Sequence, residues 1–136
     1  MRYEAPETIE RASQLLAEAS GVTRVLAGGT DLLVQMKSEV IEPDLVVDIK
    51  RITETRPVTD LGGGAFRIGA AVTGAELKEH AALKAAWPGV VEAANLIGST
   101  QVQGRATLAG NLCNGSPAAD SVPGLIAAGA VVTVTG

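Results

Sequence analysis

The chain has 136 residues, of which 46% are hydrophobic and 2% aromatic, and its formal net charge is −4. This length and hydrophobic content suit a folded domain with its own core and exclude a disordered chain. The Lys and Arg residues are scattered rather than clustered, which argues against a nucleic-acid partner.

The numbers of cysteine and histidine residues exclude several kinds of disulfide and metal site. Cys113 and His80 are the single residues of their types, which excludes an internal disulfide, an iron–sulfur site built from cysteines and a multi-histidine metal centre. We therefore expect no metal site. The polar, acidic N-terminus does not resemble a signal peptide, and no apolar run approaches the ~20 residues of a membrane helix. We expect a cytoplasmic protein without a membrane span.

Hydrophobic periodicity and turn residues predict a mixed order of helices and strands without internal repeats. A run of three glycines predicts the turn of a hairpin, and Thr73 with Glu76 matches a capping box. In chain order the predicted elements are a helix at 7–19, a strand at 23–27, a helix at 31–37 capped by Thr30, a strand at 45–49, a hairpin of 58–61 and 65–68, a helix from 74 to about 79, helices at 88–97 and 122–128, and a strand at 130–135.

A glycine turn, Ala27-Gly28-Gly29-Thr30, follows the strand predicted at 23–27. Two interpretations stay open: a plain junction between strand and helix, or a loop that presents N–H groups to a phosphate. In the second case a Cβ at Gly28 or Gly29 would clash with the phosphate or require a positive φ. The turn matches neither the P-loop nor the G-x-G-x-x-G pattern, which disfavours an ATPase or an ordinary Rossmann enzyme.

Residues 99–120 form a long polar stretch rich in turn formers, and we expect a functional loop there. Its second part, TLAGNLCNGSPAAD at 107–120, offers backbone N–H groups and short polar side chains, with Cys113 expected as a small buried residue. The alternative is an Ω-type loop held by its own Asn and Ser side chains. Two separate loops of this chemistry favour a dinucleotide ligand over a mononucleotide.

Taken together, AGGTDLL at 27–33 and TLAGNLCNGSPAAD at 107–120 resemble the FAD-binding subunit or domain of the molybdenum hydroxylases, the xanthine dehydrogenase and carbon monoxide dehydrogenase group. The resemblance implies an α+β (mixed α/β), two-lobed FAD-binding domain of the carbon monoxide dehydrogenase flavoprotein type. It implies a small lobe at 1–55 and a larger, incomplete lobe at 56–136, because the family's domain continues past this endpoint. We expect the strand at 130–135 to continue beyond Gly136.

The resemblance also implies a cofactor site. Residues 25–32 would wrap the FAD pyrophosphate through backbone N–H groups, and the 107–120 motif would line the cofactor from the opposite side. Apolar contacts would come from two residues, Ile97 and Ala106. The full implied set is Val25, Leu26, Ala27, Gly28, Gly29, Thr30, Asp31, Leu32, Ile97, Ala106, Thr107, Gly110, Asn111, Asn114, Ser116 and Asp120. No residue is expected to be catalytic in the acid–base sense.

The function that the resemblance implies is electron transfer in an oxidoreductase complex. Electrons would pass from the [2Fe–2S] clusters of a partner subunit through FAD to NAD or another acceptor, while a molybdopterin-containing large subunit oxidises the substrate. The flavin would carry the redox chemistry and the protein would position it. The alternatives are a stand-alone FAD-linked oxidoreductase of the same fold and a non-catalytic assembly fragment.

Overall fold

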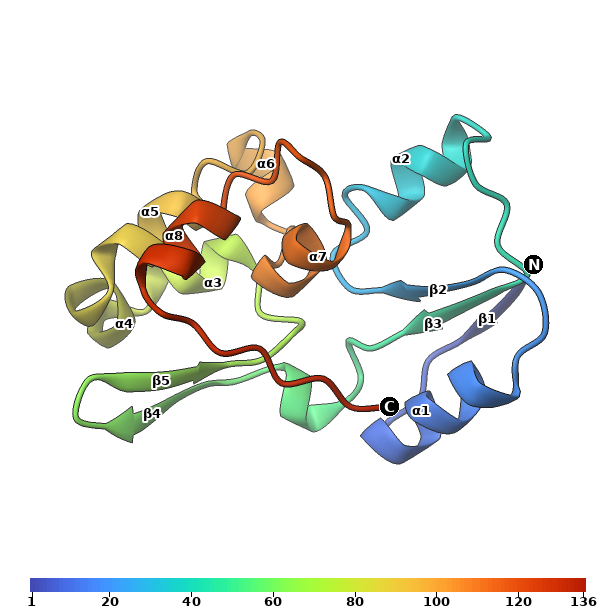
Figure 1. Ribbon diagram of the computed structural model, residues 1–136, viewed down its shortest axis with the longest axis horizontal. Helices are drawn as coiled ribbons and strands as arrows, with labels where there is room; N and C mark the ends of the chain where they lie inside the picture. Colours follow the sequence, from blue (N-terminus) through green and yellow to red (C-terminus); the bar gives the residue numbers. More distant parts are fainter.

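A three-stranded sheet forms one side of the molecule and a helical layer with a hairpin forms the other, in the computed structural model of residues 1–136 (Figure 1). The mixed α+β class expected from the sequence is confirmed. In chain order the elements are β1 (Arg2–Glu4), α1 (Ile9–Glu18), β2 (Thr23–Leu26), α2 (Leu32–Lys37), β3 (Leu45–Asp48), a 3-10 turn (Thr53–Thr55), β4 (Val58–Gly62), β5 (Ala65–Ile68), α3 (Gly74–Glu79), α4 (Ala81–Ala86), α5 (Pro88–Ala94), α6 (Thr100–Gln103), α7 (Leu108–Cys113) and α8 (Val122–Ala127).

The sheet is parallel, with β3 in the centre and β1 and β2 on its two sides. Every residue of β3 is buried, as its β-branched sequence predicts. Because the strands are parallel, the carboxyl ends of β2 and β3 lie at one edge of the sheet, and in Figure 1 this edge faces α7. Ligand sites of α/β sheets form at such edges.

Helix α1 covers the sheet through one apolar stripe. Ala12 and Leu15 pack in one core with Leu45 and Val47 of β3 and with Ile52. The hydroxyl of Thr8 caps the helix by accepting the N–H of Arg11 at 3.1 Å. The predicted helix is confirmed, and it begins after Thr8 rather than at residue 7 because Thr8 supplies that acceptor.

The second core belongs to the helical layer. It contains the buried residues Val72, Leu77, Leu83, Val90, Val91, Ala94 and Leu108, and the hairpin adds Val58, Phe66 and Ile68. The predicted hairpin is confirmed: β4 pairs with β5, and Gly62, Gly63 and Gly64 all have positive φ, which explains why the turn is built from glycine. The capping box is confirmed in part, since the Thr73 hydroxyl accepts the N–H of Glu76 at 3.2 Å.

The prediction of one long loop at 99–120 is wrong, because two short helices interrupt it. The hydroxyl of Ser99 accepts the N–H of Val102 and caps α6. The hydroxyl of Thr107 accepts the N–H of Gly110 at 2.9 Å and caps α7. Residues interpreted as turn formers therefore begin helices, which is the other position that Ser and Thr favour.

The strand predicted at 130–135 is also wrong. Residues 130–136 have no regular secondary structure, and Val131 and Val134 are 92% and 85% exposed. β-branched residues form a strand only where a neighbouring strand can pair with them, and no strand pairs with this segment. Conversely, strand β1 was not predicted. It consists of three residues and forms through its pairing with β3.

Two hydrophobic cores, one from residues 12–52 and one from residues 58–128, occupy the two sides of the molecule. We propose that they are the cores of two lobes that divide near residue 55, and we call the parts at 1–55 and 56–136 the sheet lobe and the helical lobe. None of the helices combines the length and apolar character needed to cross a membrane.

Candidate functional site

A cavity of about 710 Å³ lies between the two lobes, where the carboxyl ends of β2 and β3 face α7. Ten of its twenty lining residues are hydrophobic, and the others are polar, charged or glycine. The sheet lobe contributes Arg24, Val25, Ala27, Gly28, Gly29, Thr30, Asp31, Leu32, Gln35, Ile41 and Ile49, and the helical lobe contributes Ala70, Ile97, Ala106, Thr107, Ala109, Gly110, Asn111, Cys113 and Asn114.

A smaller cavity of about 210 Å³ adjoins the first. The two hollows share lining residues, among them Thr30 and Asp31 of the sheet lobe and Asn111 of the helical lobe. The smaller hollow also contains Ser116 and Asp120. A ligand that filled both hollows would therefore be elongated and would meet two aspartates at the smaller end.

Most of the residues expected from the sequence lie in these hollows. All but three of the expected set line the larger cavity, and two of these three, Ser116 and Asp120, line the smaller one. Leu26 lines neither and is a buried residue of β2. The structure thus brings together the AGGTDLL and TLAGNLCNGSPAAD motifs, which are far apart in the sequence.

The loop at 27–32, which we call the glycine loop, carries a run of free N–H groups. None of the six amides from Ala27 to Leu32 donates to an acceptor of the protein; the next amide, of Leu33, donates to the carbonyl of Gly29 at 3.0 Å. Six consecutive unpartnered N–H groups beside a cavity form a cradle for an anion. Gly28 and Gly29 carry no side chain that could block access to it.

The two glycines of the loop are required for different reasons. Gly29 has a φ of 78°, a conformation that other residues rarely adopt. Gly28 does not have a positive φ, but a Cβ there would lie 1.9 Å from the carbonyl oxygen of Arg105. At Gly28 the clash is therefore with the backbone of the helical lobe, rather than with a phosphate as expected from the sequence.

The polar side chains of the second motif are already engaged within the protein. The buried Thr107 hydroxyl caps α7. The side-chain oxygen of Asn111 accepts both the N–H of Ser121, at 3.2 Å, and its hydroxyl. The side-chain oxygen of Asn114 accepts from the Gln35 amide at 3.2 Å, which links the two lobes across the cavity. These bonds hold the 107–121 segment in shape.

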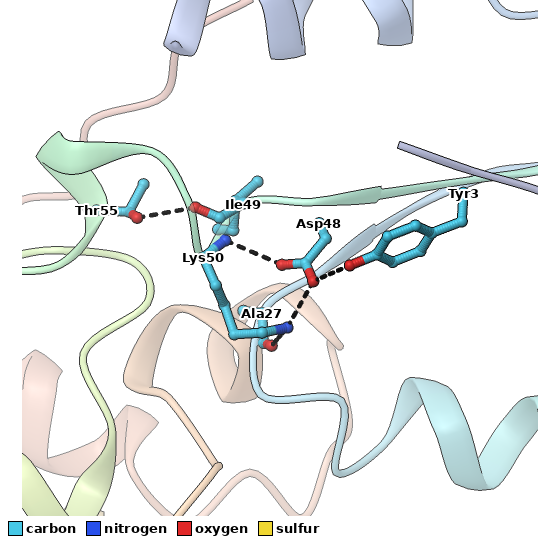
Figure 2. Close-up of polar contacts among 6 residues, drawn as sticks. All are labelled: Tyr3, Ala27, Asp48, Ile49, Lys50 and Thr55. Carbon is cyan, nitrogen blue, oxygen red and sulfur yellow. Dashed lines mark hydrogen bonds and ion pairs between the residues drawn. The ribbon is translucent and has the colours of Figure 1, made fainter. Parts of the chain in front are cut away.

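A polar network supports the glycine loop from the sheet side (Figure 2). The Asp48 carboxylate accepts from the Tyr3 hydroxyl at 2.5 Å and forms an ion pair with the Lys50 ammonium at 2.9 Å. Burial opposes ionisation of Asp48, but the bonds from Tyr3 and Lys50 outweigh it, and the pKa of Asp48 is lowered below its usual 3.8. The same hydrogen bond, with burial and the charge of Asp48, raises the pKa of Tyr3 above 10.0.

Several cavity residues were not among those expected from the sequence. Ala109 and Cys113 stand inside the second motif, and Cys113 is exposed rather than buried. Arg24 and Gln35 flank the first motif, so a wider window around it would have included them. Ile41, Ile49 and Ala70 carry no sequence signal because their place in the lining depends on how the lobes meet.

Charge in the larger cavity is sparse, with Arg24 as its one basic and Asp31 as its one acidic side chain. An anionic ligand group would therefore be recognised mainly by backbone N–H groups. Carboxylates in the smaller cavity are acceptors for hydroxyl groups. The glycine-loop amides, with Asp31 and Asp120 in the smaller cavity, suit a long ligand with an anionic part and a hydroxylated part.

Comparison with known proteins gives a consistent family. Residues 1–136 match the family described as "FAD binding domain in molybdopterin dehydrogenase". The chain is 37% identical over 119 residues to the xanthine dehydrogenase FAD-binding subunit of Escherichia coli O157:H7, covering 88% of this chain and 40% of that one. It is 35% identical over 118 residues to the carbon monoxide dehydrogenase medium chain of Hydrogenophaga pseudoflava, covering 87% and 41%.

Solved structures agree. The fold is similar to a chain of the reconstituted CO dehydrogenase from Oligotropha carboxidovorans, with a TM-score of 0.83, 31% identity, and coverage of 89% of this chain and 42% of that one. The chain thus spans about two fifths of the length of these relatives.

Proposed function

This chain belongs to the family of FAD-binding domains of molybdopterin dehydrogenases and its cofactor is FAD; from that premise we propose that it holds FAD between its two lobes as the electron-transfer part of an oxidoreductase complex. The observation that carries the proposal is the meeting of the glycine loop with the 107–114 segment at one cavity. Bound FAD would supply the redox chemistry, accepting electrons and passing them on.

The residues present fit this cofactor. The free amides of Gly28 to Leu32 suit a pyrophosphate, which needs many donors and close backbone approach. Asp31 and Asp120 in the smaller cavity suit the hydroxyl groups of ribose or ribitol. Ile97 and Ala106 offer apolar contacts within the larger cavity. Apart from Leu26, which lines neither cavity, the expected cofactor residues are therefore kept as our proposal for the site.

The proposed partners are a [2Fe–2S] subunit that delivers electrons and a molybdopterin-containing large subunit that oxidises the substrate. Support comes from the relatives, which are named as subunits or chains of xanthine and carbon monoxide dehydrogenases. We propose NAD or another small acceptor as the final recipient of the electrons. Within this arrangement, the chain's own task is to bind and orient the flavin.

Titration of the purified chain with FAD and with FMN tests the proposal, with flavin fluorescence and absorption as readouts. We expect FAD to bind and FMN to bind much more weakly, since FMN lacks the pyrophosphate and the adenosine. Equal affinity for the two flavins would contradict recognition by two separate loops. A chain that binds neither flavin would favour the alternative of a non-catalytic assembly module.

A further inference from the structure

The carbonyl group of Ala27, at the start of the glycine loop, has an unusual partner. No backbone N–H donates to this oxygen. Instead it accepts from the Lys50 ammonium at 3.0 Å (Figure 2). A long charged side chain from the end of β3 thus holds one carbonyl of the loop that follows β2.

This contact fixes more than one atom. The carbonyl of Ala27 and the N–H of Gly28 belong to the same peptide unit, which is planar and trans, so the two groups point in opposite directions. Holding the Ala27 oxygen toward Lys50 therefore directs the Gly28 N–H away from Lys50. That amide is one of the six free donors of the glycine loop.

The Lys50 ammonium is itself held in place. It pairs with Asp48, whose side chain is 8% exposed, and the other oxygen of Asp48 accepts the backbone N–H of Lys50 at 3.0 Å. The Tyr3 hydroxyl donates to Asp48 from the neighbouring strand β1. The network therefore runs from β1 through the end of β3 to the loop after β2, and it crosses all three strands of the sheet.

We propose that Lys50, held by Asp48 and Tyr3, is a positioning residue that sets the direction of the Gly28 amide of the glycine loop toward the cofactor pyrophosphate. The proposal rests on the function proposed above, that the cavity holds FAD. Lys50 does not line the cavity and acts on the cofactor through the Ala27–Gly28 peptide. Asp48, which contacts Lys50, and Tyr3, which contacts Asp48, are positioning residues one and two steps further away.

The test compares Lys50→Met with Lys50→Arg in the intact chain, with Lys78→Met as the matched control. Lys78 lies on α3, outside both cavities, and forms no ion pair. Lys50→Met should weaken FAD affinity by about tenfold, the scale of one hydrogen bond to a charged group. It should also shift the phosphorus NMR signals of bound FAD. Lys50→Arg should restore most of the affinity, and the control should change neither quantity.

Melting temperatures of the variants measured without FAD show whether a loss of FAD affinity comes from a misplaced amide or from a less stable fold. A Lys50→Met variant with wild-type affinity and unchanged phosphorus signals would overturn the proposal. The proposal would also be overturned if Lys50→Arg lost as much FAD affinity as Lys50→Met, because the hydrogen-bond donor that arginine retains would then make no difference. Tyr3→Phe removes one hydroxyl and should produce a smaller change in the same direction; no change would exclude Tyr3. A wild-type chain that binds no FAD would instead contradict the proposed function.

Discussion

The two loops that face each other across the cavity differ in which of their polar groups are free. In the glycine loop, residues 27–32, all six backbone amides lack a partner in the protein, and the one hydrogen bond to the carbonyl of Ala27 comes from Lys50, outside the loop. In the 107–114 segment, the side chains of Thr107, Asn111 and Asn114 are all hydrogen-bonded within the protein.

This difference assigns different tasks to two motifs that look alike in sequence. In our proposal the glycine loop donates to the ligand, and its two glycines allow close approach. The 107–114 segment is built to keep its own shape and to touch the other lobe. A polar residue in a family motif can therefore be needed for the wall of a site rather than for contact with the ligand.

The largest effect is expected where the two loops touch. Gly28→Ala would place a Cβ 1.9 Å from the Arg105 carbonyl, so one lobe must move. We expect a loss of about 3 kcal/mol in the free energy of unfolding, at the upper end for overpacking, together with loss of FAD binding. Gly89→Ala is the control, since Gly89 lies in α5 with open space around its Cα. Urea unfolding and flavin titration measure both quantities, and a Gly28→Ala chain that behaves like the control would contradict the contact.

The next effect concerns the interior of the second segment. Asn111→Ala would leave the amide and hydroxyl of the fully buried Ser121 without their acceptor. We expect a loss of about 2 kcal/mol, the usual penalty for an unsatisfied buried group. Asn111→Asp keeps the acceptor oxygen and should retain most of the stability. If Asn111→Ala unfolds at the same urea concentration as the wild type, the side chain is free to serve a ligand instead.

A smaller effect is expected from the helix cap. Thr107→Ala removes the acceptor for the N–H of Gly110 and should lower the free energy of unfolding by about 1 kcal/mol. Thr107→Ser keeps the hydroxyl and should restore it. Thermal unfolding followed by circular dichroism measures the difference. A Ser variant as unstable as the Ala variant would show that the methyl group, rather than the cap, matters.

The smallest effects come from the titration of the network behind the glycine loop. Tyr3 is the single tyrosine, so the ultraviolet absorbance of tyrosinate reports its pKa directly. We expect this pKa to lie above 10.0 in the wild type and to fall back toward 10.0 in Asp48→Asn. The pKa of Asp48 is lowered in the folded chain, so its stabilising contribution is present above pH 3.8 and is lost as the pH falls through the lowered value. An Asp48→Asn chain with the same acid unfolding curve as the wild type would contradict this.

Local patterns in the sequence were sufficient to predict most of the helices and strands. The stripe that includes Ala12 and Leu15, the Thr73 cap and the glycine hairpin each depend on neighbours within a few residues, and each prediction is confirmed. Segments whose state depends on distant partners were wrong or missed. The strand β1 forms through its pairing with β3, whereas residues 130–135 have strand-like composition but pair with no strand.

Prediction of the site from sequence has the same limit, because contacts between distant residues are not visible in local patterns. Both motifs were recognisable in sequence and the structure brings them to one cavity. The contact of Gly28 with Arg105 and the reach of Lys50 to Ala27 were not predicted, because they link residues separated by 77 and 23 positions and depend on how the lobes and strands meet. Tertiary geometry, rather than residue type, decides which polar groups of a motif are free.

Amide hydrogen exchange with and without FAD tests the central difference between the two loops most directly. We expect FAD to slow exchange at Gly28 to Leu32, where the amides are free, and to change exchange little at Gly110 and Asn111, whose amides already donate to Thr107. Slower exchange at Gly110 and Asn111 with none at Gly28 to Leu32 would contradict the assignment of the glycine loop as the donor side of the site.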